Sequence, residues 1–509
     1  MSDEVEGLPR LHGCGGGLGC RPMTVRPPLS IALLALLAIG GCHKPQDAGP
    51  IDVSVIGPAI GIQHPAAGDG PIDAPAAALI AATGQGLVRF DASGQIVPGL
   101  AARWAVSDGG RSLLFRLPDL PPPDRAPIEA GAIARRLRAA IAPGSPNPLT
   151  PLLGAIDEVT AVTPQVIDVE LRSPRPNMLQ LFAQPALAMG GGRLGPFAIR
   201  AMRGGVATLR LPPDPDADPD GDDAAHAPDV RLRGESAGLA VARFVAGRSG
   251  LVLGGRFADL PVARAAALPR DTLHLDPVKG LFGLAFVAGD SGAAADADMR
   301  RALAMAIDRD RIAQLLGVAG WTPSPAIVAP ATPEVATPAM PAWAAMPLEQ
   351  RRSLAAQTVA RQPGLPTLRV AMPPGPGARM LFALIADDWR RIGIGAVAVG
   401  AADPADLRLI DAVAPADVAS FYLRAFACDQ HVPCTTVSDQ VLIAARFAPT
   451  LAERAVLLTQ ADALIAQNTP FIALGPPIRW SLVAPDLDLY RDSPRGIHPL
   501  NELRSPLKR

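Results

Sequence analysis

One passage constrains the fold more than any other, because Gly86–Leu117 contains two tight turns set between segments with the apolar pattern of β-strands. Leu87–Phe90 is an extended apolar run, Asp91–Gly94 has the composition of a hairpin turn, and Ile96–Val97 resumes the apolar pattern. The first half of the passage therefore predicts an antiparallel hairpin.

The second half of the passage predicts a further turn and a further strand. Leu100–Trp104 has the spacing of a short helical turn, and Ser107–Gly110 has the composition of a tight turn. Leu113, Phe115 and Leu117 recur at every second position, which is the spacing of a strand with one buried face. We expect the order hairpin, helical turn, tight turn, strand.

Length and composition set the outer limits. A chain of 509 residues is too long for one ordinary core and predicts two or three lobes. Because the formal net charge is only -1, the sequence does not favour nucleic acid or an anionic membrane surface as a partner. With 49% apolar and 19% charged residues, the chain has the composition of a packed globular protein.

An N-terminal segment has the pattern of an export signal. Residues 23–41 carry one early arginine and then an apolar run from Leu29 to Ile39, too short for a stable transmembrane helix but typical of a signal-peptide core. Ile39-Gly40-Gly41-Cys42 resembles a lipobox. We therefore expect cleavage before Cys42 and lipidation of its thiol, which would anchor the protein to a membrane of the cell envelope. The alternative is an ordinary secretory signal with a chance cysteine.

The segment before this signal is expected to lie outside the mature protein. Met23 is the expected start, so that residues 1–22 would be a mis-annotated upstream extension. Cys14 and Cys20 stand there in a Gly-rich context, and a metal-binding tail is the alternative interpretation.

Two cysteines then remain, Cys428 and Cys434. An even number of cysteines in an exported protein, with five residues between them, predicts a disulfide that closes a small loop. A metal site that uses His431 between them is the alternative, but three ligands on one tight loop make a weak zinc pattern. No metal or other cofactor is predicted for the chain.

Several blocks in the same order resemble the extracellular solute-binding proteins of ABC transporters, the oligopeptide- and dipeptide-binding family 5. The Gly86–Leu117 passage is similar to the family's G-L strand, D-x-x-G-x-I-x-P-x-L-A turn, tryptophan, S-D-G turn and F-x-L strand. Met299–Ile312 is similar to its V-R-x-A-L-x-x-A-I-D-R-x-x-I helix block, in which Asp308 can cap a following turn. The resemblance covers about residues 75–509.

This resemblance implies an α/β fold of the periplasmic-binding-protein type II, with two hinged lobes and a smaller extra domain. The implied limits are 42–86 for the first segment of lobe I, 87–189 for the smaller domain, 190–285 for the second segment of lobe I, 286–484 for lobe II and 485–509 for the return to lobe I. It also implies a monomeric, non-enzymatic receptor that binds a peptide or similar solute between its lobes and delivers it to ABC permease subunits.

This chain departs from the family's pattern at the segment that anchors the ligand. Peptide-binding members have a W-x-x-D segment after the strand that enters the cleft, and its carboxylate pairs with the ligand's ammonium. Ala412-Val413-Ala414-Pro415 occupies that place in this chain. Asp411 or Asp417 could take over the role and are the predicted ligand-binding residues, although either could instead be a surface carboxylate.

The sequence is compatible with two other functions. Gly234-Glu235-Ser236-Ala237-Gly238 fits the G-x-S-x-G pattern of a serine esterase between a predicted strand and helix, with His498 as a conceivable base, but no acid partner or oxyanion loop is identifiable. A binding-protein homologue that has lost transport is the second alternative. The loop Pro212–Asp229 resembles a calcium loop but has Ala227 at the twelfth ligand position, so we expect a solvated loop.

Overall fold

The computed structural model describes residues 49–61, 70–119, 129–190, 194–212, 229–289, 295–362, 364 and 366–503. All of these fall within one compact unit, Ala48–Arg509. Cys14, Cys20, the predicted signal with Cys42 and most of the loop Pro212–Asp229 lie outside the described residues. In the described part of the chain, no helix combines the length and the apolar character needed to cross a bilayer.

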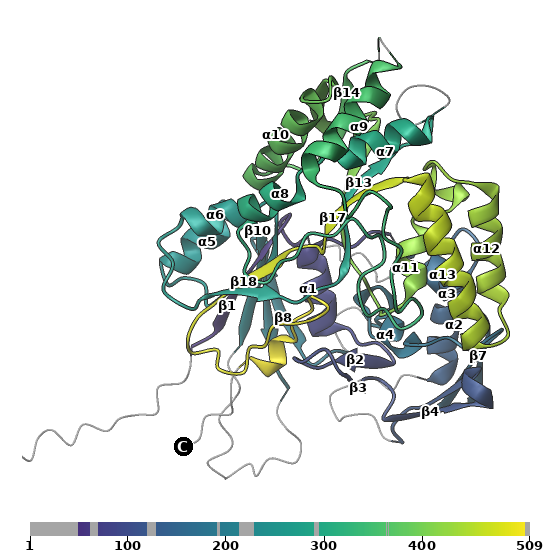
Figure 1. Cartoon of the computed structure of the whole chain (residues 1–509). Helices are drawn as coiled ribbons and strands as arrows, with labels where there is room; N and C mark the ends of the chain where they lie inside the picture. The colour runs from purple at the N-terminus through teal and green to yellow at the C-terminus, as the bar shows by residue number, and fades with distance from the viewer. Residues whose placement is uncertain are drawn as a thin grey trace, which may run out of the picture. The chain divides into compact units, whose positions relative to one another are not determined.

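A seven-stranded mixed sheet contains β1 at its centre, parallel to both of its neighbours (Figure 1). Four of the six residues of β1 are buried, as expected for a strand covered on both faces. In sheet order the strands are β12 (Leu273–Asp276), β18 (Arg479–Val483), β11 (Leu251–Arg256), β1 (Ile51–Ile56), β10 (Val230–Glu235), β9 (Val206–Arg210) and β8 (Ala198–Arg203). Helices α1 (Ala74–Thr83) and α5 (Ala237–Val245) contact this sheet, and α6 (Leu260–Ala265) contacts α5.

A smaller unit follows in the chain and contains a hairpin and a four-stranded antiparallel sheet. The predicted hairpin is confirmed, since β2 pairs with β3 in antiparallel register. The predicted helical turn at Leu100–Trp104 is wrong: Trp104 lies in β4 and pairs with Phe115 of β5, so cross-strand pairing overrides the helical spacing of a short segment. The elements are β2 (Val88–Phe90), β3 (Ile96–Pro98), β4 (Arg103–Ser107), β5 (Ser112–Arg116), β6 (Ile156–Thr163), β7 (Val166–Leu171), α2 (Ala130–Ile141), α3 (Thr150–Leu153) and α4 (Met178–Phe182).

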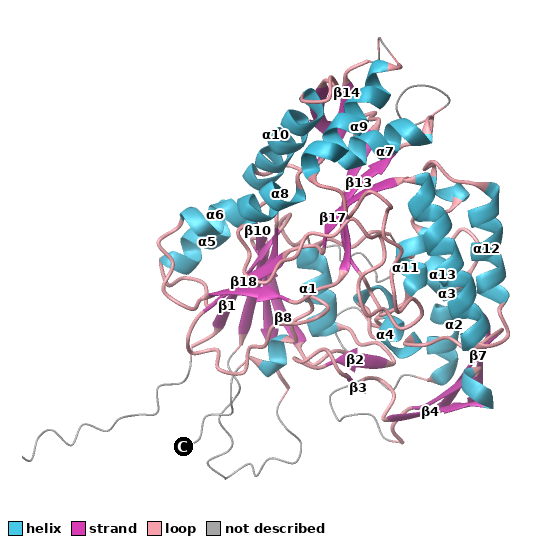
Figure 2. Cartoon of the chain, in the orientation of Figure 1, coloured by secondary structure: helices cyan, strands magenta, loops and turns pink. Residues whose placement is uncertain are grey.

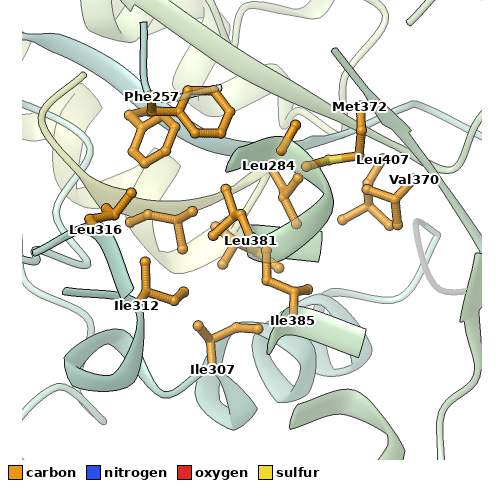
Figure 3. Packing of buried hydrophobic residues seen from close by; sticks show 14 of the residues in the cluster. Phe257, Leu284, Ile307, Ile312, Leu316, Val370, Met372, Leu381, Ile385 and Leu407 are labelled. Atoms are coloured by element: carbon orange, nitrogen blue, oxygen red, sulfur yellow. The ribbon is translucent and has the colours of Figure 1, made fainter. Parts of the chain in front are cut away.

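The third sheet has five strands and lies beside helices that cover it (Figure 2). Its order is β15 (Ala396–Gly400), β14 (Leu368–Met372), β16 (Leu407–Val413), β13 (Gly280–Phe286) and β17 (Phe471–Gly475), with α7 (Ala297–Ala306), α8 (Arg309–Leu316), α9 (Leu348–Ala360) and α10 (Pro376–Arg390). Figure 3 shows Leu284, Ile312 and Leu381 from this unit packed with Phe257, which follows β11 of the seven-stranded sheet. One buried apolar cluster therefore connects the two sheets.

The block Met299–Ile312 forms two helices that meet at Asp308. The Asp308 carboxylate accepts a hydrogen bond from the Arg311 backbone N–H at 3.0 Å, so the predicted cap is confirmed. Arg309 is buried and donates to the carbonyl oxygens of Ala473 and Ala304. The block therefore ties α8 to β17 and has a structural role.

The C-terminal third contributes a group of packed helices beyond β16. They are α11 (Ala419–Arg424), α12 (Thr436–Phe447) and α13 (Leu451–Asn468). Between α11 and α12, Cys428 and Cys434 are joined in a disulfide with an Sγ–Sγ distance of 2.07 Å. In the described part of the chain, no cluster of three or more His, Cys, Asp or Glu side chains is arranged to hold a metal ion. Short 3₁₀ turns are η1 (Asp108–Gly110), η2 (Pro185–Leu187), η4 (Cys428–Gln430) and η5 (Leu500–Glu502).

The chain passes twice between the seven-stranded and five-stranded sheets. The first passage lies between Asp276 of β12 and Gly280 of β13, and the second between Gly475 of β17 and Arg479 of β18. The sequence placed these changes after residues 285 and 484, because a buried apolar run predicts a strand without indicating which sheet it joins. Strand β13 therefore belongs to the five-stranded sheet and β18 to the seven-stranded sheet, whereas the expected limits place each of them with the other sheet.

Candidate functional site

The two passages between the sheets lie side by side. Asp276 and Arg479 are paired residues of β12 and β18, and Phe282 and Gly475 are paired residues of β13 and β17. Two short adjacent connections between α/β units are the arrangement that a hinge requires, since few backbone dihedrals need to change when the units move. The region around these connections is the first part of the candidate site.

Asp411 of β16 is held by two arginines of the other sheet. Its carboxylate accepts hydrogen bonds from Arg479 Nη1 at 2.7 Å and from Arg256 Nε at 3.0 Å, and its side chain is 5% exposed. Both arginines also donate to its backbone oxygen. Nearby, burial raises the pKa of Asp259, and the negative charge of Asp411 adds to that shift. In this conformation the charge of Asp411 is therefore balanced by protein groups.

Asp417 lies in the loop between β16 and α11 and belongs to a second cluster. Arg495 donates from Nη2 to the Asp417 carboxylate and, at 3.2 Å, to Gln180 Oε1. Arg495 is 8% exposed, whereas the Asp417 side chain is 34% exposed. Burial raises the pKa of Tyr422, and the charge of Asp417 raises it further. Asp417 is thus the more accessible of the two predicted ligand-binding residues.

Three amide side chains in and around α4 hold the same loop. Asn177 Nδ2 donates to the Asp417 carbonyl at 2.9 Å, and Gln184 Nε2 donates to the Pro415 carbonyl at 2.6 Å. Gln180 accepts from the Asp417 backbone N–H at 2.8 Å. The sequence reasoning missed these residues, although their spacing of three and four positions places them on one face of a helix.

Ser236 and His498 do not form the arrangement of a serine esterase. Ser236 is the exposed N-cap residue of α5 with extended backbone angles of φ -63° and ψ 153°, and it lacks the strain of a nucleophile elbow. The His498 side chain is 6% exposed, with Nε2 3.1 Å from Asp276 Oδ2. No hydrogen bond joins Ser236 to His498 among the residues that the structure describes. The geometry therefore does not support the esterase alternative.

Comparisons with known proteins agree with the two-sheet arrangement. Neither a family model nor a curated protein sequence matches the chain. Among solved structures, the murein tripeptide binding protein MppA of Escherichia coli has a TM-score of 0.75 at 18% identity, over 89% of this chain and 98% of that one. The chain has the fold of periplasmic solute-binding proteins.

Two further structures show how broadly this fold is shared. Haemophilus influenzae OppA, in complex with RPPGFSPFR, has a TM-score of 0.72 at 14% identity over 89% of this chain and 99% of that one. Campylobacter jejuni NikZ, in complex with Ni(L-His), has a TM-score of 0.66 at 16% identity over 88% and 97%. The α/β solute-binding-protein fold implied by the sequence blocks is therefore confirmed.

A second MppA structure has the same fold. The unliganded open form of that protein has a TM-score of 0.62 at 18% identity, over 90% of this chain and 97% of that one.

Proposed function

We propose that this chain is the lipid-anchored substrate-binding protein of an ABC importer, and that it belongs to family 5. It closes two lobes over a peptide or a similar small solute and delivers the solute, unchanged, to permease subunits. One observation carries the proposal most directly: the two sheets are joined by two adjacent connections and by charged side chains that pair across them. A fold of this kind can release and re-form such pairs as the lobes move.

The envelope location and the anchor rest on the N-terminal sequence. The apolar run that ends at Cys42 has the length and flanking residues of a lipoprotein signal. Signal cleavage before Cys42 would leave the receptor tethered outside the cytoplasmic compartment as a monomer. The disulfide between Cys428 and Cys434 suits an oxidising compartment of that kind.

The ligand is proposed to meet the loop that carries Asp417. The MppA structure is described as that of a murein tripeptide binding protein, and the OppA structure contains a nonapeptide, so a peptide is the first candidate. A peptide ammonium would replace the Arg495 guanidinium as the partner of Asp417, with α4 holding the loop in position. Asp411 is proposed to stabilise closure, since its carboxylate already has two partners.

A thermal-shift experiment with a tripeptide library tests the proposal. We expect a binding peptide to raise the melting temperature, because a ligand at about 100 times its Kd stabilises the folded state by about 2.7 kcal/mol. Asp417→Asn should weaken binding by tenfold or more, whereas Asp310→Asn, which removes the same charge at an exposed position of α8, should leave binding unchanged. Stoichiometric labelling of Ser236 by a fluorophosphonate would contradict the receptor proposal.

A second variant tests the proposed closure. In Asp411→Asn, Arg256 and Arg479 lose their anionic partner, which should shift the closing equilibrium by about 1.5 kcal/mol, or about tenfold, towards the open form. Small-angle scattering should then give a larger radius of gyration than for the unsubstituted protein, with Asp310→Asn again as the control. Identical scattering curves for all three proteins would show that Asp411 does not stabilise closure.

A further inference from the structure

A small cavity lies between the smaller unit and the C-terminal helices, and its lining includes Val418 but neither Asp417 nor Arg495. It is lined by Gly154 after α3, by the start of α4 and by residues of α11, α12 and α13. Four of the residues that line the cavity are arginines, and no aspartate or glutamate lines it. These arginines are Arg175, Arg424, Arg446 and Arg454.

The positive charge around this cavity is only partly neutralised. Arg454 has a buried partner, since its Nε lies 2.5 Å from Glu334 Oε1. Among the described residues, Arg424 forms an ion pair only with Asp429, at 3.8 Å, and that carboxylate is 63% exposed. Its Nε is buried and has no hydrogen-bond partner among the described residues. The positive charge of Arg424 is therefore only weakly neutralised, and its guanidinium can donate further hydrogen bonds.

The other two arginines donate hydrogen bonds only to carbonyl oxygens in the part of the chain that the structure describes. Arg175 donates to the carbonyls of Pro174 and Arg446, and Arg446 Nη2 donates to the Gly154 carbonyl at 2.9 Å. Within the part of the chain that the structure describes, neither forms an ion pair. Because Gly154 belongs to the smaller unit and Arg446 to α12, these contacts cross the boundary between them.

The pKa values of Arg175 and Arg446 are lowered, mainly by burial. Burial lowers the pKa of Arg175 to about 10; the charges of Arg454 and Arg446 act in the same direction, and the charge of Glu334 opposes them. Burial also lowers the pKa of Arg446, and the charge of Arg424 adds to it. An anion in the cavity would offset the repulsion between these cations.

We propose that the cavity is an oxyanion site, in which Arg175, Arg424 and Arg446 bind a carboxylate, phosphate or sulfate group. The cavity volume of about 40 Å³ holds roughly three water molecules, which is the size of one such group and far below that of a peptide. Planar guanidinium groups match the paired oxygens of these anions. The cavity adjoins the proposed solute-binding loop through Val418, but neither Asp417 nor Arg495 lines it. An occupant would hold α12 against the smaller unit.

Melting temperatures measured in inorganic phosphate, with chloride at equal ionic strength as the reference, test this site. We expect a saturable increase for the unsubstituted protein. In Arg424→Gln, which loses only one long ion pair and therefore keeps the fold, the apparent Kd for phosphate should rise by tenfold or more. Arg135→Gln removes the same charge from an exposed position of α2 and should leave the phosphate response unchanged.

The same titration with succinate distinguishes the two sources of the anion. A larger effect of phosphate would identify a free inorganic ion, and a larger effect of succinate would identify an organic carboxylate; both support the site. A response that does not saturate, or one that is equal in Arg424→Gln and the unsubstituted protein, would overturn it. Failure of peptides to bind would affect only the proposed function.

Discussion

Replacement of Glu334 by alanine is expected to lower the free energy of unfolding by about 3–5 kcal/mol. Glu334 is 6% exposed and connects two helices: Oε1 accepts from Arg454 Nε of α13 at 2.5 Å, and Oε2 accepts from the Ala419 N–H at the start of α11 at 2.9 Å. Without the carboxylate, the buried Arg454 guanidinium has no anionic partner and the Ala419 N–H loses its acceptor. Urea denaturation followed by circular dichroism measures the loss.

Two further variants separate the charge from other effects. Glu334→Gln keeps an acceptor for the Ala419 N–H but not the charge, so it should retain part of the stability. Glu349→Ala breaks an ion pair in which the glutamate side chain is 88% exposed and 3.6 Å from Arg352, and it should cost less than about 0.5 kcal/mol. Equal losses for Glu334→Ala and Glu349→Ala would show that the Glu334–Arg454 pair does not stabilise the fold.

The sequence predicted elements well where local signals agreed with tertiary contacts. The hairpin around Asp91–Gly94 and the cap at Asp308 depend on residues a few positions apart, so a short stretch of sequence contains all of the interacting residues. The Ala- and Pro-rich stretch that forms α1 gave no apolar periodicity, because alanine fills both faces. Its readable signal is Asp73 as N-cap, followed by Pro75 in the first turn.

The candidate site was much harder to predict than the fold. Asp411 and Asp417 were identified as carboxylates near the cleft strand, but the arginines bound to them lie 68 to 155 positions away in the sequence. Nothing in a single sequence joins Asp411 to Arg256 or Asp417 to Arg495, because these pairs form only when β16 meets other segments of the fold. For the same reason the arginines of the proposed oxyanion site were not recognised as a group.

A buried carboxylate in α13 has the opposite effect on stability from Glu334. Asp462 is 1% exposed; its Oδ2 accepts from the Ala339 N–H at 2.7 Å, while its Oδ1 is buried without a hydrogen-bond partner among the described residues. Burial raises the pKa of Asp462 to about 6, and the Ala339 hydrogen bond offsets only part of that effect. At neutral pH this side chain therefore carries a charge that the fold stabilises poorly.

Asp462→Asn is expected to raise the free energy of unfolding at pH 8 by about 3 kcal/mol, since a pKa near 6 in the folded state stands about two units above that of the unfolded chain. Between about pH 4 and pH 6 the folded protein keeps a proton that the unfolded chain has released. The stability contributed by Asp462 is therefore full below pH 4 and falls as the pH rises through this window.

In urea denaturation at several pH values, the gain in the free energy of unfolding from Asp462→Asn should be near zero at pH 4, grow towards pH 6 and then level off. The exposed Asp310→Asn should show no such trend, and a gain for Asp462→Asn that is independent of pH would mean that the buried carboxyl is not the titrating group.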